Sequence, residues 1–122
     1  MAVTHTAAIR NAIADNFLVL CGTDAAYLQL EDGGVLVSRH DFPTPSGAVS
    51  AATLDFTCGG GIADTSPASG TIDGAKLYTS GDTEVCAMDS VGTAGTDIVV
   101  SSVSIATTDT VTLTALSWEA PD

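Results

Sequence analysis

The start of the chain carries apolar side chains at helical spacing. Residues three or four positions apart share one face of a helix, and four apolar residues are spaced in this way: Ile9, Ile13, Phe17 and Leu20. Thr4 or Thr6 can accept the first backbone N–H bond as a cap, and Gly22 suits a left-handed C-terminal cap. The pattern predicts an amphipathic helix over about residues 4–21. Its apolar face must be buried, either against the chain's own sheet or against a neighbouring subunit.

Beyond the helix, apolar residues recur at every second position, which is typical of half-buried strands. An Asp-Gly-Gly turn at residues 32–34 separates two such runs, 26–32 and 35–42, and this combination is a strong hairpin signal. Pro43 and Pro45 then interrupt the pairing. A second hairpin is predicted around Gly81-Asp82, with strands over 74–80 and 83–90.

The run over residues 51–58 alternates cleanly and predicts a strand with one buried face. The residues of its buried side are Ala52, Leu54, Phe56 and Cys58, and those of its exposed side are Thr53, Asp55 and Thr57. Glycine, serine and threonine dominate residues 59–71, so we expect a loop there.

Two further runs, over residues 96–105 and 109–121, complete the set of predicted strands. The last run changes parity, with Val111, Leu113 and Ala115 on one face and Leu116 and Trp118 on the other. A β-bulge near Ala115 would restore the alternation, and a strand end covered on both faces is the alternative.

These elements predict a mainly β fold, an antiparallel β-sandwich or barrel of jelly-roll type. It has about seven to eight short strands and one N-terminal amphipathic helix. We expect a single domain over residues 1–122, with the helix at about 4–21 and the sandwich at about 25–120.

Charge narrows the range of partners. The chain has 15 acidic residues against three basic ones, Arg10, Arg39 and Lys76, and a net charge of −12. Binding to nucleic acid or to an anionic membrane needs lysine and arginine to meet the phosphates, so neither is expected. The charge is compatible with a basic protein partner.

Three cysteines, Cys21, Cys58 and Cys86, form an odd number without C-x-x-C spacing. We therefore expect small buried side chains in a reducing compartment rather than disulfides or a reactive thiol. No basic leader followed by an apolar run opens the chain, and no apolar stretch is long enough to span a bilayer. The expectation is synthesis in the cytoplasm without secretion by a signal peptide.

Candidate chemistry is sparse. His40-Asp41 is the one neighbouring pair of histidine and acid, no nucleophile motif accompanies it, and we expect His40 at a strand end on the surface. The remaining histidine, the cysteines and the scattered acids give no metal-ligand spacing, although a loop cation at Asp73 or Asp82 stays open. Three glycines at residues 59–61 lack the lysine of a phosphate loop. The sequence thus predicts no catalytic residue, cofactor or metal, and favours a non-enzymatic role in binding or assembly.

Both ends of the chain resemble small virion proteins of tailed bacteriophages. In those proteins a Thr-His-Thr-x-x-(I/V)-R-x-A-(I/L)-A-D run opens a helix, and residues 4–15 match it. The closing stretch, residues 95–121, is similar to the ending of the same proteins, where a G-x-D-(I/L) motif and a strand pair precede a short tail with proline. The three cysteines and the Pro43–Pro45 break depart from the pattern.

The resemblance implies a structural component of the virion. The leading expectation is a capsid decoration or cement protein that binds the assembled major capsid protein and self-associates as a dimer or trimer. A protein of the tail or head–tail joint is the alternative, and a carbohydrate-binding β-sandwich module is a more remote one.

Overall fold

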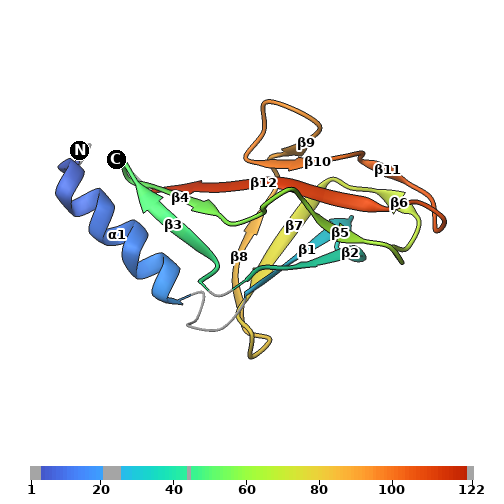
Figure 1. The fold of residues 1–122 in the computed structure, drawn as a ribbon, viewed down its shortest axis with the longest axis horizontal. Helices are drawn as coiled ribbons and strands as arrows, with labels where there is room; N and C mark the ends of the chain where they lie inside the picture. Colours follow the sequence, from blue (N-terminus) through green and yellow to red (C-terminus); the bar gives the residue numbers. More distant parts are fainter. Residues whose placement is uncertain (1–3, 21–25, 44, 121–122) are drawn as a thin grey trace.

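The computed structural model describes residues 4–20, 26–43 and 45–120. One helix, α1 (Ala7–Leu20), precedes the strands of this described part. The strands are β1 (Tyr27–Asp32), β2 (Val35–Asp41), β3 (Gly47–Ser50), β4 (Thr53–Phe56), β5 (Ile62–Asp64), β6 (Gly70–Thr71), β7 (Gly74–Tyr78), β8 (Glu84–Met88), β9 (Val91–Gly92), β10 (Ile98–Val100), β11 (Ser104–Ile105) and β12 (Val111–Glu119). The predicted class, mainly β with antiparallel sheets and one N-terminal helix, is confirmed (Figure 1).

Two hairpins build the first sheet, whose strand order is β2-β1-β7-β8 with every pair antiparallel. Both hairpins are the predicted ones. Gly33 and Gly34 have φ of 56° and 89° in the first turn, and Asp82 has φ of 65° in the second. Positive φ at these positions is what a tight hairpin turn requires, and glycine adopts it without steric cost.

The second sheet has the order β3-β4-β12-β10-β9, and β5 pairs with the first part of β12. β9 and β10 run parallel, so this sheet is mixed rather than purely antiparallel. The strands outnumber the prediction partly because the expected loop over 59–71 contains β5 and β6. These short polar strands form by pairing with β12 and β11, which lie far along the chain, so local alternation does not reveal them.

The parity change in the last strand is a bulge, as predicted. Ile98 pairs with Leu116 and Val99 with Ala115, but Val100 pairs with Leu113, which leaves Thr114 as the extra residue. Val111, Leu113 and Leu116 are consequently all buried on one side of β12.

One hydrophobic core takes side chains from both sheets, including Leu28, Leu30 and Leu77 from the first and Leu54, Leu113 and Leu116 from the second. The predicted buried side of the 51–58 run is confirmed, because Ala52, Leu54, Phe56 and Cys58 are all buried. Phe56 contacts Phe42 at 4.9 Å between ring centroids.

The helix covers the chain's own sheet, packing on β3 and β4 at the end where β12 finishes (Figure 1). Phe17 stacks on Trp118 with ring centroids 4.0 Å apart, and Ala14 is fully buried. Arg10 donates to the carbonyl of Ala120 at 2.8 Å, and Thr6 caps the helix by accepting from the Ile9 N–H at 3.4 Å.

The predicted helix face is wrong at one position. Ile9 is 49% exposed, because the packed face is centred on Ala14 and includes the polar residues Arg10 and Asn11. Asn11 accepts a hydrogen bond from the Ala52 backbone, so polar anchoring rather than apolar spacing sets the rotation of the helix. The side chain of Leu20, and Cys21 and Gly22, lie outside the described residues.

Candidate functional site

His40 is buried, not at the surface as its position at a strand end suggested. Its side chain is 0% exposed and both ring nitrogens have partners. Nε2 lies 2.9 Å from Ser38 Oγ, and Nδ1 lies 2.8 Å from the carbonyl oxygen of Ile62. Asp41, its neighbour in sequence, faces the other way and pairs with Arg39 at 2.9 Å.

The partners assign the tautomer of His40. A carbonyl oxygen only accepts, so Nδ1 carries the proton and donates it to Ile62. Burial lowers the pKa of His40 below its ordinary 6.5, against the opposing influence of the Ile62 bond and of Asp64 and Asp41. The neutral ring then accepts at Nε2, and the Ser38 hydroxyl donates.

A serine bonded to a histidine is the nucleophile–base pair of many hydrolases, but this one has no route to a substrate. Ser38 is 1% exposed, so its Oγ cannot meet a substrate carbonyl. The pair instead joins β2 to β5, next to a second link in which the Arg39 N–H donates to Asp64 at 3.0 Å. Its role is therefore to hold two strands together.

The described cysteines are not activated thiols. Burial raises the pKa of Cys58, and burial together with the nearby Glu84 carboxylate raises the pKa of Cys86. Cys58 is buried as expected, while Cys86 is half-buried on β8. Cys21, for which burial was also expected, lies outside the described residues.

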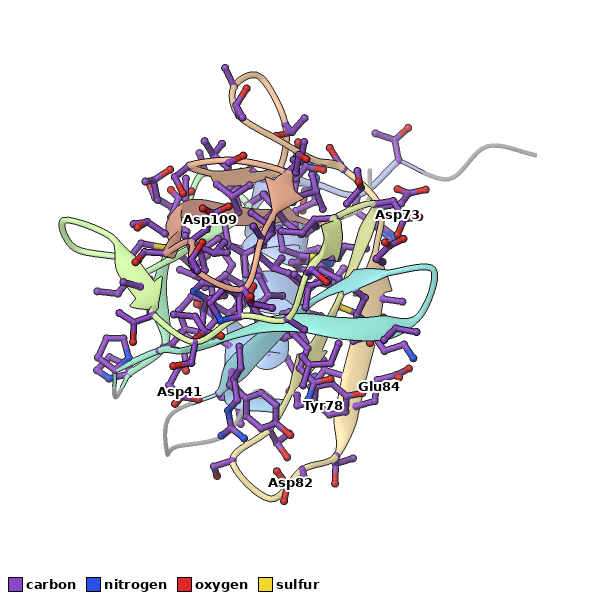
Figure 2. All side chains as sticks on the ribbon, turned by 90° about the vertical axis from the view of Figure 1, so that its right-hand side faces the viewer. Asp41, Asp73, Tyr78, Asp82, Glu84 and Asp109 are labelled. Carbon is purple, nitrogen blue, oxygen red and sulfur yellow. The ribbon has the colours of Figure 1, made fainter. Side chains whose placement is uncertain are left out.

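The two acids considered for a loop cation are engaged in turns. Asp73 accepts from the Gly33 N–H at 3.0 Å, and Asp82 accepts from the Tyr27 hydroxyl at 2.8 Å. Figure 2 shows them toward opposite ends of the molecule. Within the described ranges, no group of three histidine, cysteine or acidic side chains is placed to hold a metal ion. The glycines at 59–61 form a turn closed by a bond from the Gly61 N–H to the Cys58 carbonyl.

An open pocket of about 500 Å³ lies beside β12. It forms where β4 and β5 pair with separate parts of β12 and the chain between them turns away. Asp55 and Asp97 belong to its walls, and Thr114–Ser117 belong to its lining. Carboxylate and hydroxyl oxygens dominate its polar groups, so the pocket is acidic.

The outer face of the first sheet carries an aromatic stack that sequence reasoning missed. The Arg39 guanidinium lies 3.7 Å from the centre of the Tyr27 ring, and Tyr78 stacks on Tyr27 at 5.1 Å. Burial raises the pKa of Tyr27, and the bond to Asp82 raises it further. Part of the signal was available, because Tyr27 and Arg39 lie on the two strands of a predicted hairpin. Tyr78 lies on β7, whose pairing with β1 was not predicted.

All three basic side chains of the chain are engaged in ion pairs with its own acids. The pairs are Arg10–Glu119 at 2.8 Å, Arg39–Asp41 at 2.9 Å, and Lys76 with Glu31 and Glu84 at 3.9 Å each. Acidic residues far outnumber these basic ones, and Figure 2 shows Asp73, Asp82 and Asp109 well apart. The molecule therefore presents a negative field in many directions.

Among the described residues, large apolar side chains are exposed in two places. Val35 and Leu36, at 69% and 46% exposed, lie at the start of β2, while Ile9 and Val19, at 49% and 65%, lie on the outer face of α1. Neither place holds a convergent set of polar groups. Together with the inaccessible Ser38–His40 pair, this leaves the acidic surface as the best candidate for function.

No family model, curated protein or solved structure matches this chain. The described residues include no helix long and apolar enough to cross a membrane.

Proposed function

We propose that the chain is a non-enzymatic structural protein of a tailed-bacteriophage virion, a decoration protein that binds the assembled capsid shell. Its partner is the major capsid protein, and its place is the virion. The resemblance of both chain ends to small phage virion proteins supports this assignment. A protein of the tail or head–tail joint is the alternative.

The observation that carries the proposal is the charge distribution. Each basic side chain is already paired within the molecule, so the charge left to meet a partner is almost entirely negative. A protein surface rich in lysine and arginine complements such a field, and this complementarity speeds association and selects the partner.

Decoration stabilises a shell by mass action. A protein that binds only the assembled shell adds about 2.7 kcal/mol per site when its free concentration is about 100 times Kd. A β core with an acidic surface suits this role, because the described part of the chain is folded before it binds.

The test uses shells and tails separated from virions of the phage whose genome encodes the chain. The purified protein is added to each, and binding is followed by sedimentation and by labelling with antibody in negative stain. We expect binding to shells, higher thermal stability of the decorated shells, and weaker binding as salt rises from about 0.01 M to about 0.15 M. Labelling of tails alone would support the alternative, and binding to neither would refute both.

A further inference from the structure

The free edge of β8 is the surface from which we infer a contact. In the order β2-β1-β7-β8, β8 has β7 on one side and no described strand on the other (Figure 1). The described hydrogen bonds of its backbone all go to β7. A strand at the edge of a sheet presents unpaired N–H and C=O groups that another strand can use.

The opposite edge of the same sheet is covered. Asp64 accepts from the Arg39 N–H and the Ala68 N–H donates to Val37, so the segment after β5 lines β2. β8 also lacks the lysine or proline that often protects an edge, and a bulge at Val85 is its main irregularity.

We propose that β8 pairs antiparallel with β8 of a second copy of this chain, joining two four-stranded sheets into one of eight strands. A twofold contact is self-complementary, so the strand must tolerate meeting its own reversed sequence. Centred on Cys86, and with the bulge residue Val85 left unpaired as it is against β7, the register places Glu84 opposite Ala87 of the other copy, so that outer-face residues meet outer-face residues.

Charge favours this register. Glu84 is the one acid within the strand, and it faces Ala87 rather than another carboxylate. The Glu84 carboxylate also has Lys76 at 3.9 Å, which offsets part of its charge at the contact. A chain with a net charge of −12 resists most self-contacts, and this edge avoids the direct repulsion that other surfaces would create.

Packing favours it as well. Val85, Cys86 and Met88 are half-buried against the core while the strand has one open side. A second β8 would cover that side and add main-chain hydrogen bonds. Self-association through β8 is independent of what the protein binds on a virion.

The experiment measures the mass of the purified protein by light scattering over a range of concentrations. We expect the mass of a dimer, which is twice the 12.2 kDa of one chain. Ala87→Glu places a new carboxylate opposite Glu84 of the other copy, and should weaken self-association by at least about tenfold. Ala48→Glu is the matched control, since Ala48 is an exposed alanine on β3, and it should leave the dimer intact.

A second measurement uses the thiol at the centre of the register. In a Cys21→Ser background, a mild oxidant should cross-link two copies through Cys86, and Cys86→Ser should abolish the cross-link. Circular dichroism checks that each variant keeps its fold. A monomer at every concentration, a trimer, or a dimer indifferent to Ala87→Glu with no Cys86 cross-link would each overturn the proposal.

Discussion

His40 shows how a single buried residue can make stability depend on pH. Its Nδ1 proton is donated to the Ile62 carbonyl, and burial favours the neutral form of the ring. Because burial lowers its pKa below 6.5, the unfolded chain binds a proton at a higher pH than the folded chain does. The stabilising contribution is complete above pH 6.5 and is lost as the pH falls toward the folded pKa.

We therefore predict that the free energy of unfolding drops between about pH 7.5 and about pH 5.5 through His40. Urea denaturation of the wild type and of His40→Gln measures it. The glutamine cannot take up a proton, so the drop should be smaller in the variant even though the variant is less stable at both values. Equal pH dependence in the two proteins would contradict the assignment.

The β3–β4 turn contains two alanines in a conformation that alanine disfavours. Ala51 and Ala52 have φ of 51° and 65°, in the left-handed region where a Cβ crowds the backbone. The turn is nevertheless fixed, because the Ala52 N–H donates to Asn11 on the helix. The strained backbone of this turn therefore reduces the free energy of unfolding.

Ala51→Gly should consequently stabilise the protein by about 0.5–1 kcal/mol, since it relieves the strain at an exposed position. Ala48→Gly, in the neighbouring strand, should destabilise by a similar amount because glycine there only adds freedom to the unfolded chain. Opposite shifts in melting temperature are the expected result. A loss of stability in both variants would argue against strain at Ala51.

At the scale of elements, α1 is held by an aromatic stack and polar anchors rather than by a broad apolar stripe. Phe17 rests on Trp118, whereas Ile9 points to solvent. We predict that Phe17→Ala costs about 2 kcal/mol, less than a fully buried phenylalanine because Phe17 is half-buried. Ile9→Ala should change stability by less than about 0.5 kcal/mol. Urea denaturation of both variants checks the contrast, and equal losses would restore the sequence-predicted face.

Local patterns predicted the elements that local chemistry determines. The two hairpins follow from their glycine and aspartate turns, β4 from the alternation within the 51–58 run, and the bulge from the parity change before Leu116. The first two residues of that run, Ala51 and Ala52, belong to the β3–β4 turn and not to the predicted strand. Contacts between distant segments were out of reach of such patterns. β5 and β6 form by pairing with β12 and β11. The rotation of the helix follows from its hydrogen bonds with Ala120 and Ala52.

The candidate site was less predictable for the same reason. His40 shares parity with the buried Phe42 and alternates with the charged Arg39 and Asp41, so its burial had a signal. Its partner Ile62 is 22 residues away, and nothing local links the two. The pocket beside β12 depends on three segments, so no motif marks it.

At the scale of the whole molecule, charge repulsion opposes folding. The chain carries 15 acids and three bases, and the ion pairs that involve exposed side chains contribute little on their own. Salt screens repulsion between carboxylates spread over the surface more than it weakens these few pairs.

The melting temperature should accordingly rise when salt increases from about 0.01 M to about 0.15 M. Scanning calorimetry measures the rise. A variant with Asp15, Asp55 and Asp89 replaced by asparagine removes three exposed charges and should show a smaller rise. A melting temperature that falls with salt would mean that the ion pairs outweigh the repulsion.

The stack of Phe17 on Trp118 joins residues 101 positions apart in a chain made from the N-terminus onward. The ribosome therefore synthesises α1 well before β12, the strand that carries Trp118. The inner face of α1 stays exposed to solvent until that last strand has emerged. Because Trp118 is the sole tryptophan, its fluorescence reports this closing step directly.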